Sequence, residues 1–338
     1  MIKIISKKKI WLTLSSIFVA TSLVFLIVWG LNFGIDFTGG SLMEVKFSDN
    51  VPEQVLIKEK LNNLDIGDLL VQSSGDNNLL FRFQEIDEDK HQKILEILKN
   101  LDKEVNEKYL MLHETGINQD ISKSTSTIVS TSSGTKTELK SDYSLFQELR
   151  FDSIGPSIGS ELKRKSIYNV IIVLLAIVFY VAWAFRKVSE SISSWKYGVC
   201  ALIALFHDCL FVLGVFSFLG KFYNMEINSA FIAAILTVLG YSVNDTIVIF
   251  DRIRENLLKT SGEFSDIVNK SLNQTLSRSI NTSLTTMLVL GSIFIFGGDS
   301  IKDFVLALLI GVGIGTYSSI FLAAPILVFW EEMSSNKK

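Results

Sequence analysis

Long runs of apolar residues separated by short polar segments dominate the pattern of this chain. A helix needs about 20 apolar residues to cross a hydrocarbon core of roughly 30 Å, because it rises about 1.5 Å per residue. Six runs come near that length, at about 10–30, 167–185, 198–219, 228–250, 280–297 and 303–330. The pattern therefore predicts an α-helical polytopic membrane protein with six transmembrane helices.

The first run follows lysines at 7–9, so a cleaved signal peptide has to be weighed against a permanent anchor. Its apolar stretch is about 20 residues long, whereas signal peptides have about 7–15, and it ends in VWG at 28–30 without a small-residue cleavage pattern. We therefore expect residues 1–30 to comprise a cytoplasmic N-terminus and an uncleaved first helix.

Basic residues are distributed unevenly between the two sides of the predicted bundle. The N-terminus and the 186–197 and 251–279 segments are rich in Lys and Arg, whereas the opposite side has Lys221 and Lys302 in its short segments. Short cytoplasmic loops carry such an excess, so both termini are predicted to be cytoplasmic. The basic run 163–165 lies on the outer side, but it belongs to a long loop, and long loops escape the rule.

The large outer loop, residues 31–166, is predicted to be a small α+β periplasmic domain. Strand patterns occur at 42–47, 69–72, 79–83 and about 145–151, and helical patterns occur at 52–62 and 87–105. Their β-α-β-β-α-β order is that of the ferredoxin-like unit. A stretch at 118–142 rich in Ser, Thr and Lys is predicted to be mobile. His91 has no neighbouring ligand at metal-binding spacing and is expected at the surface.

The rest of the chain is predicted to be membrane bundle and tail. Residues 167–330 would hold five helices, with a cytoplasmic amphipathic helix at 260–276 lying on the membrane surface, because its apolar residues share one face. Residues 331–338 would form a cytoplasmic tail. In the last run Gly311, Gly315 and Ser319 recur every four residues, which is typical of closely packed transmembrane helices.

The most informative residue is Asp245, which interrupts the fourth apolar run. A carboxylate at the middle of a bilayer costs roughly 2.5–3.5 kcal/mol, so it needs a partner, a proton or a function. Arg278, at the start of the fifth run, can reach a similar depth. Because a nearby guanidinium favours the charged carboxylate and burial opposes it, we predict that Asp245 and Arg278 form a proton relay. The alternative is a structural ion pair.

Further polar residues surround this pair in the predicted helices. In the fifth run, Asn281, Thr282 and Thr285 follow Arg278 at i+3, i+4 and i+7. These residues therefore share one helical face, which is expected to point into the bundle. His207 and Asp208, in the third run, could equally well form a purely structural contact. The predicted supporting polar face comprises Asn244, Tyr241, Asn281, Thr282, Thr285, His207 and Asp208.

Other candidate sites point to no catalysis. The GIDFTGG segment contains Gly34, Asp36, Gly39 and Gly40 and predicts a tight exit from the first helix, without the Lys of a phosphate loop. The chain's two cysteines fall on opposite faces of the third helix, so they do not pair. We expect no catalytic residues, no metal and no nucleic acid partner.

Five motifs together resemble the SecD/SecF family of bacterial protein-export membrane proteins, and its SecF members over nearly the whole chain. They are GIDFTGG at 34–40, IGPSIGSEL at 154–162, VLGYSVNDTIVIFDRIREN at 238–256, LNQTLSRSINTSLTT at 272–286 and GTYSSIFLAAP at 315–325. The resemblance places the family's membrane Asp on Asp245 and its Arg on Arg278. It also implies half of an RND-type transporter fold. The stretch at 118–142 looks longer than the family's usual domain.

The resemblance implies a non-enzymatic accessory subunit of the Sec translocase in the bacterial inner membrane. With SecD it would use the proton motive force in late-stage export of preproteins, without a cofactor, with protons or sodium ions as coupling ion. Implied partners are SecD, the SecYEG channel, YajC and YidC, exported unfolded polypeptide and membrane lipids. Two alternatives remain, an RND-like proton-driven exporter of lipids or small molecules and a passive assembly scaffold.

Overall fold

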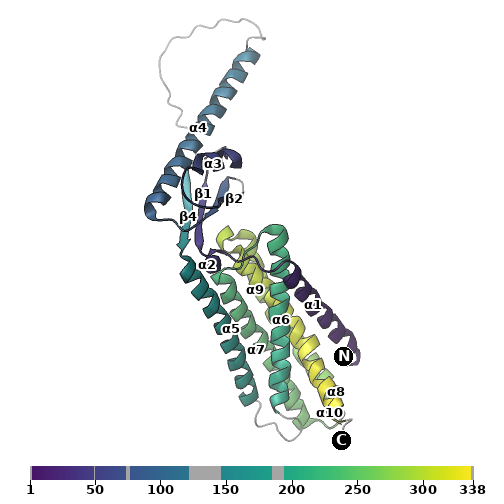
Figure 1. The fold of residues 1–338 in the computed structure, drawn as a ribbon. Helices are drawn as coiled ribbons and strands as arrows, with labels where there is room; N and C mark the ends of the chain where they lie inside the picture. The colour runs from purple at the N-terminus through teal and green to yellow at the C-terminus, as the bar shows by residue number, and fades with distance from the viewer. Residues whose placement is uncertain (1, 49, 74–76, 122–145, 185–193, 336–338) are drawn as a thin grey trace. The chain divides into compact units, whose positions relative to one another are not determined.

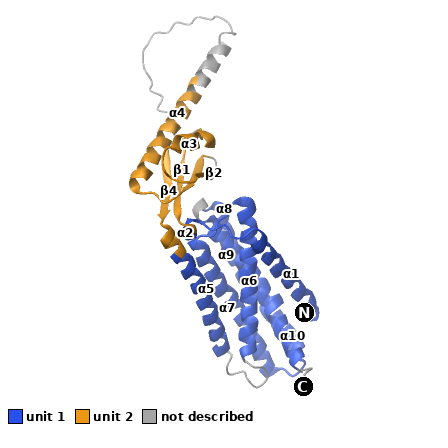
Figure 2. Ribbon diagram, viewed as in Figure 1, with its two compact units in different colours: residues 1–37, 161–338 blue, residues 38–160 orange. Residues whose placement is uncertain are grey.

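The computed structural model describes residues 2–48, 50–73, 77–121, 146–184 and 194–335. The chain divides into two compact units (Figure 2). Unit 1, Met1–Phe37 with Glu161–Lys338, is helical, and unit 2, Thr38–Ser160, contains the sheet. Residues 122–142 of the Ser/Thr/Lys-rich stretch and most of the predicted 186–197 loop lie outside the described residues.

The described residues of the model contain six helical segments long and apolar enough to cross a membrane, which confirms the prediction of a multi-pass membrane protein (Figure 1). The sixth segment is α9 and α10 joined by a π-helical turn, η3. The elements are α1 (Lys8–Val28), α5 (Pro156–Ala184), α6 (Ser194–Tyr223), α7 (Ser229–Lys259), α8 (Phe264–Phe296), α9 (Asp299–Ser318), η3 (Ser319–Ala323) and α10 (Ala324–Ser335). The short helices η1 (Ile5–Lys7) and α2 (Ile35–Thr38) flank α1.

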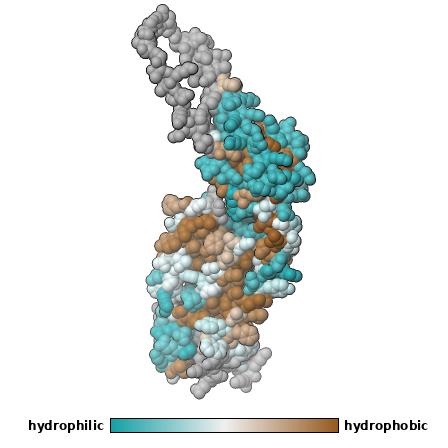
Figure 3. Space-filling model, turned by 90° about the vertical axis from the view of Figure 1, so that its left-hand side faces the viewer, coloured by the Kyte–Doolittle hydropathy of each residue, from teal (hydrophilic) through white to brown (hydrophobic). Residues whose placement is uncertain are grey.

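The core of unit 1 is formed mainly by α6, α7 and the sixth segment. About half of the most apolar window of each is buried (50%, 50% and 56%), against 6% for α5 and 11% for α8. Aromatic side chains fill this core, and Phe216 of α6 lies against Phe231 of α7 with 4.5 Å between ring centroids. The apolar faces left outside form brown patches on unit 1 in Figure 3, as expected for a protein whose solvent is lipid.

The predicted surface helix at 260–276 is wrong as a separate element. It is the first part of α8, which runs unbroken from Phe264 to Phe296. No Gly or Pro interrupts the chain between 264 and 290, so nothing ends the helix there. Its apolar residues Ile267, Val268 and Leu272 are buried in unit 1. The tail predicted to begin at 331 is likewise helical as far as Ser335.

Unit 2 has the predicted β-α-β-β-α-β order. Its elements are β1 (Gly40–Lys46), α3 (Gln54–Leu61), β2 (Leu70–Ser73), β3 (Asn78–Phe83), α4 (Glu88–Ile121) and β4 (Gln147–Ile154). The sheet order is β2-β3-β1-β4 with antiparallel neighbours, and Met43 of β1 pairs with both Phe81 and Phe151. This is the ferredoxin-like arrangement. The helix α4 extends well beyond the predicted end at 105 and includes residues 118–121 of the stretch expected to be mobile.

His91 is not a surface residue as expected. It is 5% exposed and stacks on Phe151 of β4, with 3.8 Å between ring centroids. Its ring nitrogens lie 3.2 Å from Glu88 Oε1 and 2.8 Å from Glu148 Oε1. Hydrogen bonds from Gln92 and His91 lower the pKa of Glu88. The histidine thus links the first turn of α4 to β4.

Candidate functional site

The start of α7 is held by the loop that leaves α1. The Asn228 side chain accepts a hydrogen bond from the Phe231 amide at 2.9 Å, and Asp36 Oδ2 accepts one from the Ser229 amide at 2.7 Å. Two of the amides left without helical partners are therefore satisfied. The Gly34 amide also donates to the Ile227 carbonyl at 2.8 Å. The predicted signature turn is thus attached to the helix that carries Asp245.

The glycines of that turn have backbone reasons to be glycine. Gly39 has φ +75°, and a Cβ there would lie 2.7 Å from the Cα of Pro156. Gly40, with φ +120°, begins β1. Residues other than glycine rarely adopt backbone conformations with such positive φ angles.

Asp245 lies on the buried side of α7 and is 8% exposed. Its Oδ1 accepts a hydrogen bond from Ser279 Oγ of α8 at 2.7 Å. Its Oδ2 is buried and has no hydrogen-bond partner. A buried polar atom without a partner is costly, so this oxygen is the place where a proton or a donor from another subunit can bind.

Arg278 does not form an ion pair with Asp245 within 4 Å in the described part of the chain. It is exposed and lines a polar pocket of about 420 Å³ together with Asp251, Arg252 and Gln274. The direct contact comes instead from its neighbour Ser279, which the sequence analysis missed.

Two polar stripes run along α8, and the expected one is not the buried one. The residues predicted to point into the bundle are exposed in this chain. They are Arg278, Asn281, Thr282 and Thr285. The buried stripe repeats every four residues as Ser271, Thr275, Ser279 and Ser283. The four-residue period places these residues on one helical face, but the exposed stripe has helical spacing as well, so the period alone does not identify the face that meets α7.

Next to this contact, α7 presents a mixture of polar residues. The Tyr241 hydroxyl donates to Ser283 Oγ of α8 at 3.3 Å. Asn244 is exposed, like the outer stripe of α8. The structure therefore brings Tyr241, Asp245 and the buried stripe together, and it leaves Asn244 on the surface.

Asp208 forms a second buried cluster, on α6. It is fully buried, and its Oδ2 accepts hydrogen bonds from Ser242 Oγ of α7 at 2.6 Å and Ser318 Oγ of α9 at 2.7 Å. His207 Nδ1 lies 3.0 Å from Oδ1. His207 is 2% exposed, and its Nε2 has no hydrogen-bond partner. Three helices thus meet at one carboxylate.

The sixth segment lies very close to α7. A Cβ on Gly311 would be 2.1 Å from Val238 Cγ2, and one on Gly315 would be 2.9 Å from Ser242 Cβ. Ser319, the first residue of η3, is fully buried and its Oγ lies 2.8 Å from Thr246 Oγ1. π-Helical turns are rare and are often found at functional sites. Here the turn brings the Ser319 hydroxyl to Thr246 and to the Ser242 carbonyl of α7.

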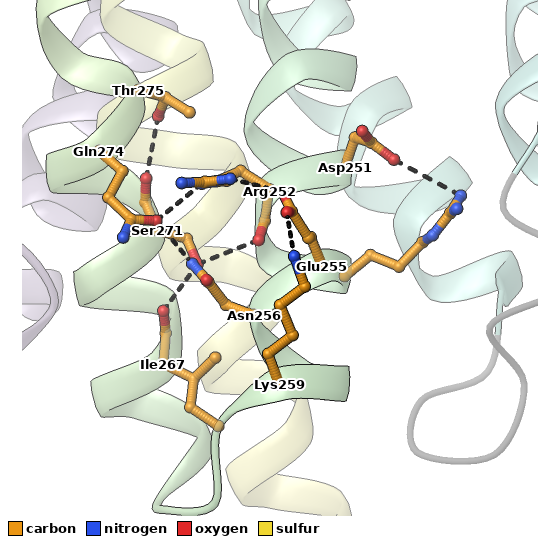
Figure 4. A network of polar contacts seen from close by, with 10 residues as sticks. Asp251, Arg252, Glu255, Asn256, Lys259, Ile267, Ser271, Gln274 and Thr275 are labelled. Atoms are coloured by element: carbon orange, nitrogen blue, oxygen red, sulfur yellow. Dashed lines mark hydrogen bonds and ion pairs between the residues drawn. The ribbon is translucent and has the colours of Figure 1, made fainter.

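The C-terminal end of α7 and the first turns of α8 are joined by a polar network, shown in Figure 4. Arg252 Nε donates to Gln274 Oε1 at 2.7 Å, and its Nη1 donates to Glu255 at 2.5 Å. Asn256 Nδ2 donates to Ser271 Oγ and to Gln274 Oε1, both at 2.8 Å. These bonds hold the two helices in register below the Asp245–Ser279 contact.

The arrangement places two carboxyl groups, Asp208 and Asp245, between the helices of unit 1. The described residues include no group of three or more His, Cys, Asp or Glu side chains placed to hold a metal ion. The fold and this site define a polytopic membrane protein with ionisable groups buried between its helices.

Comparison with known proteins agrees with this class. The family model "Protein export membrane protein SecD/SecF, C-terminal" matches residues 134–333, and "SecD/SecF GG Motif" matches residues 24–51. The chain is 38% identical to protein translocase subunit SecF of Thermobaculum terrenum, covering 98% of this chain and 94% of that one. It is 36% identical to the SecF subunit of Anaerolinea thermophila, with the same coverage.

Solved structures agree as well. The crystal structure of SecDF, a translocon-associated membrane protein from Thermus thermophilus, superposes with a TM-score of 0.73 at 28% identity. That match covers 98% of this chain but 39% of the SecDF chain. A SecDF structure in a super-membrane-facing form gives a TM-score of 0.61 over 99% of this chain. The chain therefore belongs to the SecF branch of the SecD/SecF family of protein-export membrane proteins.

Proposed function

We propose that this chain is an accessory subunit of the Sec translocase that works with SecD and uses the proton motive force to promote late-stage export of preproteins. The relatives' names support the translocase role, and the SecDF neighbour, of which this chain matches less than half, supports pairing with SecD. The observation that carries the coupling role is Asp245, a buried carboxyl group with one oxygen unpartnered.

The exposed stripe of α8 supports the need for a partner in the membrane. Polar side chains of a transmembrane segment are costly in lipid and almost always face protein or water. Arg278, Asn281, Thr282 and Thr285 are exposed in this chain, and Asn244 of α7 is exposed as well. In the complex this surface would be covered by SecD, which would place SecD next to the Asp245–Ser279 contact.

The coupling ion is taken to be a proton. Hard metal cations in proteins take about six or more oxygen ligands. At Asp245 this chain supplies one carboxylate and the Ser279 hydroxyl. A proton needs only the unpartnered Oδ2, and its transfer across the membrane is worth about 2.3 kcal/mol per 100 mV. A sodium ion would require most of its ligands from the partner.

Helix α7 offers a route from this proton site to the external domain. A shift of α7 on protonation would act at its first turn, where Asp36 binds the Ser229 amide and Gly34 binds the Ile227 carbonyl. The chain continues directly from that loop into β1 of unit 2. Movement of α7 would therefore be transmitted along the backbone to the domain that we place in the periplasm.

The rest of the assignment follows from the role in export. The protein would lie in the bacterial inner membrane with both termini cytoplasmic, as the basic residues of the short loops indicate. The SecYEG channel, YajC, YidC and exported unfolded polypeptide would be further partners. No catalytic step is assigned to this chain.

The partner surface can be tested in cells that depend on this chain for export. Thr282→Trp places a bulky ring on the exposed stripe, and Ile280→Trp places the same ring on the opposite face of α8, where Ile280 is 46% exposed. We expect Thr282→Trp to reduce co-purification of SecD and export by at least fivefold, while Ile280→Trp retains both. Equal effects of the two variants would contradict the assigned surface.

A further inference from the structure

A cavity of about 290 Å³ opens in unit 1 near the outer ends of the helices, and carbon atoms line it throughout. Its walls come from the loop after α1 and from α5, α6 and α7, including Phe33, Ile171, Leu213 and Phe231. Ile167 and Ile171 on its α5 side are 55% and 47% exposed, so the cavity is open toward the lipid. Ligand pockets hold about 300–1,000 Å³, so this one fits a slender apolar group.

The cavity reaches at least the depth of one leaflet of a bilayer. Leu213 and Cys209, which line it on α6, lie ten and fourteen residues before the outer end of that helix at Tyr223, or about 15 and 21 Å at a rise of about 1.5 Å per residue. Half of a hydrocarbon core of roughly 30 Å is also about 15 Å. A chain entering from the outer surface could therefore extend along the cavity to the middle of the membrane.

The mouth of the cavity is basic. Lys163 is one of the lining residues, and its Nζ lies 4.1 Å from the centroid of the Phe33 ring. Arg164 follows it and is exposed, without a carboxylate within 4 Å among the described residues. Lys165 is paired with Glu161 at 2.8 Å. Lys163 and Arg164 thus place two positive charges at this end, and the exposed Glu161 carboxylate interacts with Arg164 as well as with Lys165.

The acidic residues of the loops at this end, Asp36 and Glu226, lie against the backbone of neighbouring segments. Asp36 accepts a hydrogen bond from the Ser229 amide, and Glu226 is buried next to Gly34. An apolar cavity one leaflet deep with a basic mouth has the two parts that a phospholipid needs, a place for an acyl chain and a place for a phosphate.

We propose that this cavity is a binding site for one anionic phospholipid of the outer leaflet, with an acyl chain between α5 and the α6–α7 pair and its phosphate at Lys163 and Arg164. The lipid also supplies packing for α5, whose apolar window is only 6% buried by the protein. This site is separate from Asp245 and does not depend on the proposed proton coupling.

Native mass spectrometry of the full chain co-purified with SecD tests the site, with the complex exchanged into phosphatidylglycerol or phosphatidylcholine of the same acyl chains. Ile171→Trp fills the cavity. Ile172→Trp adds the same ring at a neighbouring position that does not line it and is 61% exposed. Lys163→Gln removes the charge, and Lys163→Arg retains it.

We expect the wild type and Ile172→Trp to retain one more phosphatidylglycerol molecule than Ile171→Trp. Lys163→Gln should reduce the preference for phosphatidylglycerol over phosphatidylcholine at least fivefold, and Lys163→Arg should restore it. The site is refuted if Ile171→Trp retains as much lipid as Ile172→Trp, or if the wild type retains both lipids equally. Retention of a peptide at the cavity in place of lipid would also overturn the proposal.

Discussion

Ser242 and Asp245 lie one turn apart on α7 and bind different neighbouring helices. Ser242 donates a hydrogen bond to Asp208 of α6, and Asp245 accepts one from Ser279 of α8. A single short segment of α7 therefore connects two buried carboxyl groups. A change in protonation at Asp245 would act on a helix that is already tied to the rest of the core.

The Ser279 hydroxyl should contribute to the stability of the bundle. Ser279→Ala removes the hydrogen bond donated to Asp245 and is expected to lower the free energy of unfolding by about 1–3 kcal/mol, as for a lost bond to a buried polar or charged group. Chemical unfolding of the purified complex in detergent measures this. Ser277→Ala, at an exposed position of the same helix, is the control and should change little. Equal stability of the two variants would show that the Ser279–Asp245 hydrogen bond does not stabilise the bundle.

The contact between α7 and α9 should tolerate no side chain at Gly311. Gly311→Ala places a Cβ 2.1 Å from Val238 Cγ2 and should destabilise the protein by about 1–3 kcal/mol through overpacking. Adding Val238→Ala should recover most of the loss, because it removes the clashing methyl groups.

Gly313→Ala is the matched control for that series. Its Cβ would meet Met287 at 3.7 Å, an ordinary contact, so the substitution should be nearly neutral. Thermal unfolding of the wild type and these three variants provides the comparison. If Val238→Ala failed to rescue Gly311→Ala, the close approach of these two helices at this point would be in doubt.

The first turns of α4 should become less stable in acid. Hydrogen bonds from Gln92 and His91 lower the pKa of Glu88, so its contribution to stability is present above the ordinary value of 4.5 and is lost as the pH falls through the lowered value. Hydrogen exchange of the first turn of α4, corrected for intrinsic rates, should therefore increase over that range.

Glu88→Gln should remove most of this pH dependence, while Glu96→Gln, further along α4, should leave it intact. The measurement uses the full chain and follows the peptides that contain residues 88–95. An identical pH profile in Glu88→Gln and the wild type would contradict the role given to this carboxylate.

The length of the apolar runs was enough to predict six membrane helices, because nothing but a helix satisfies the backbone of a single long apolar segment in lipid. The order of strands and helices likewise predicted the sheet of unit 2. The start of the fifth membrane helix, α8, was harder to predict. An apolar face at 264–276 is compatible with a surface helix or with the buried start of a longer one, and only packing against unit 1 distinguishes them.

The site was predicted in part. Asp245 stands out because a charge inside an apolar run is rare, and the structure buries it. The face of α8 that meets α7 could not be chosen from periodicity alone, since the Arg278 and Ser279 stripes both repeat at helical spacing. His91 was missed because its partner Glu148 lies 57 positions away, and local spacing gives no sign of such a contact.

The central claim is that the Asp245 carboxyl group must bind and release a proton for this chain to promote export. The most direct measurement is preprotein export into inverted membrane vesicles, with and without a proton motive force, comparing wild type with Asp245→Asn. The amide is nearly isosteric and can still accept the Ser279 bond, so normal amounts of the complex should be present. We predict that Asp245→Asn retains ATP-driven export, and that the stimulation of export by the proton motive force falls at least tenfold. Stimulation equal to that of the wild type would contradict it.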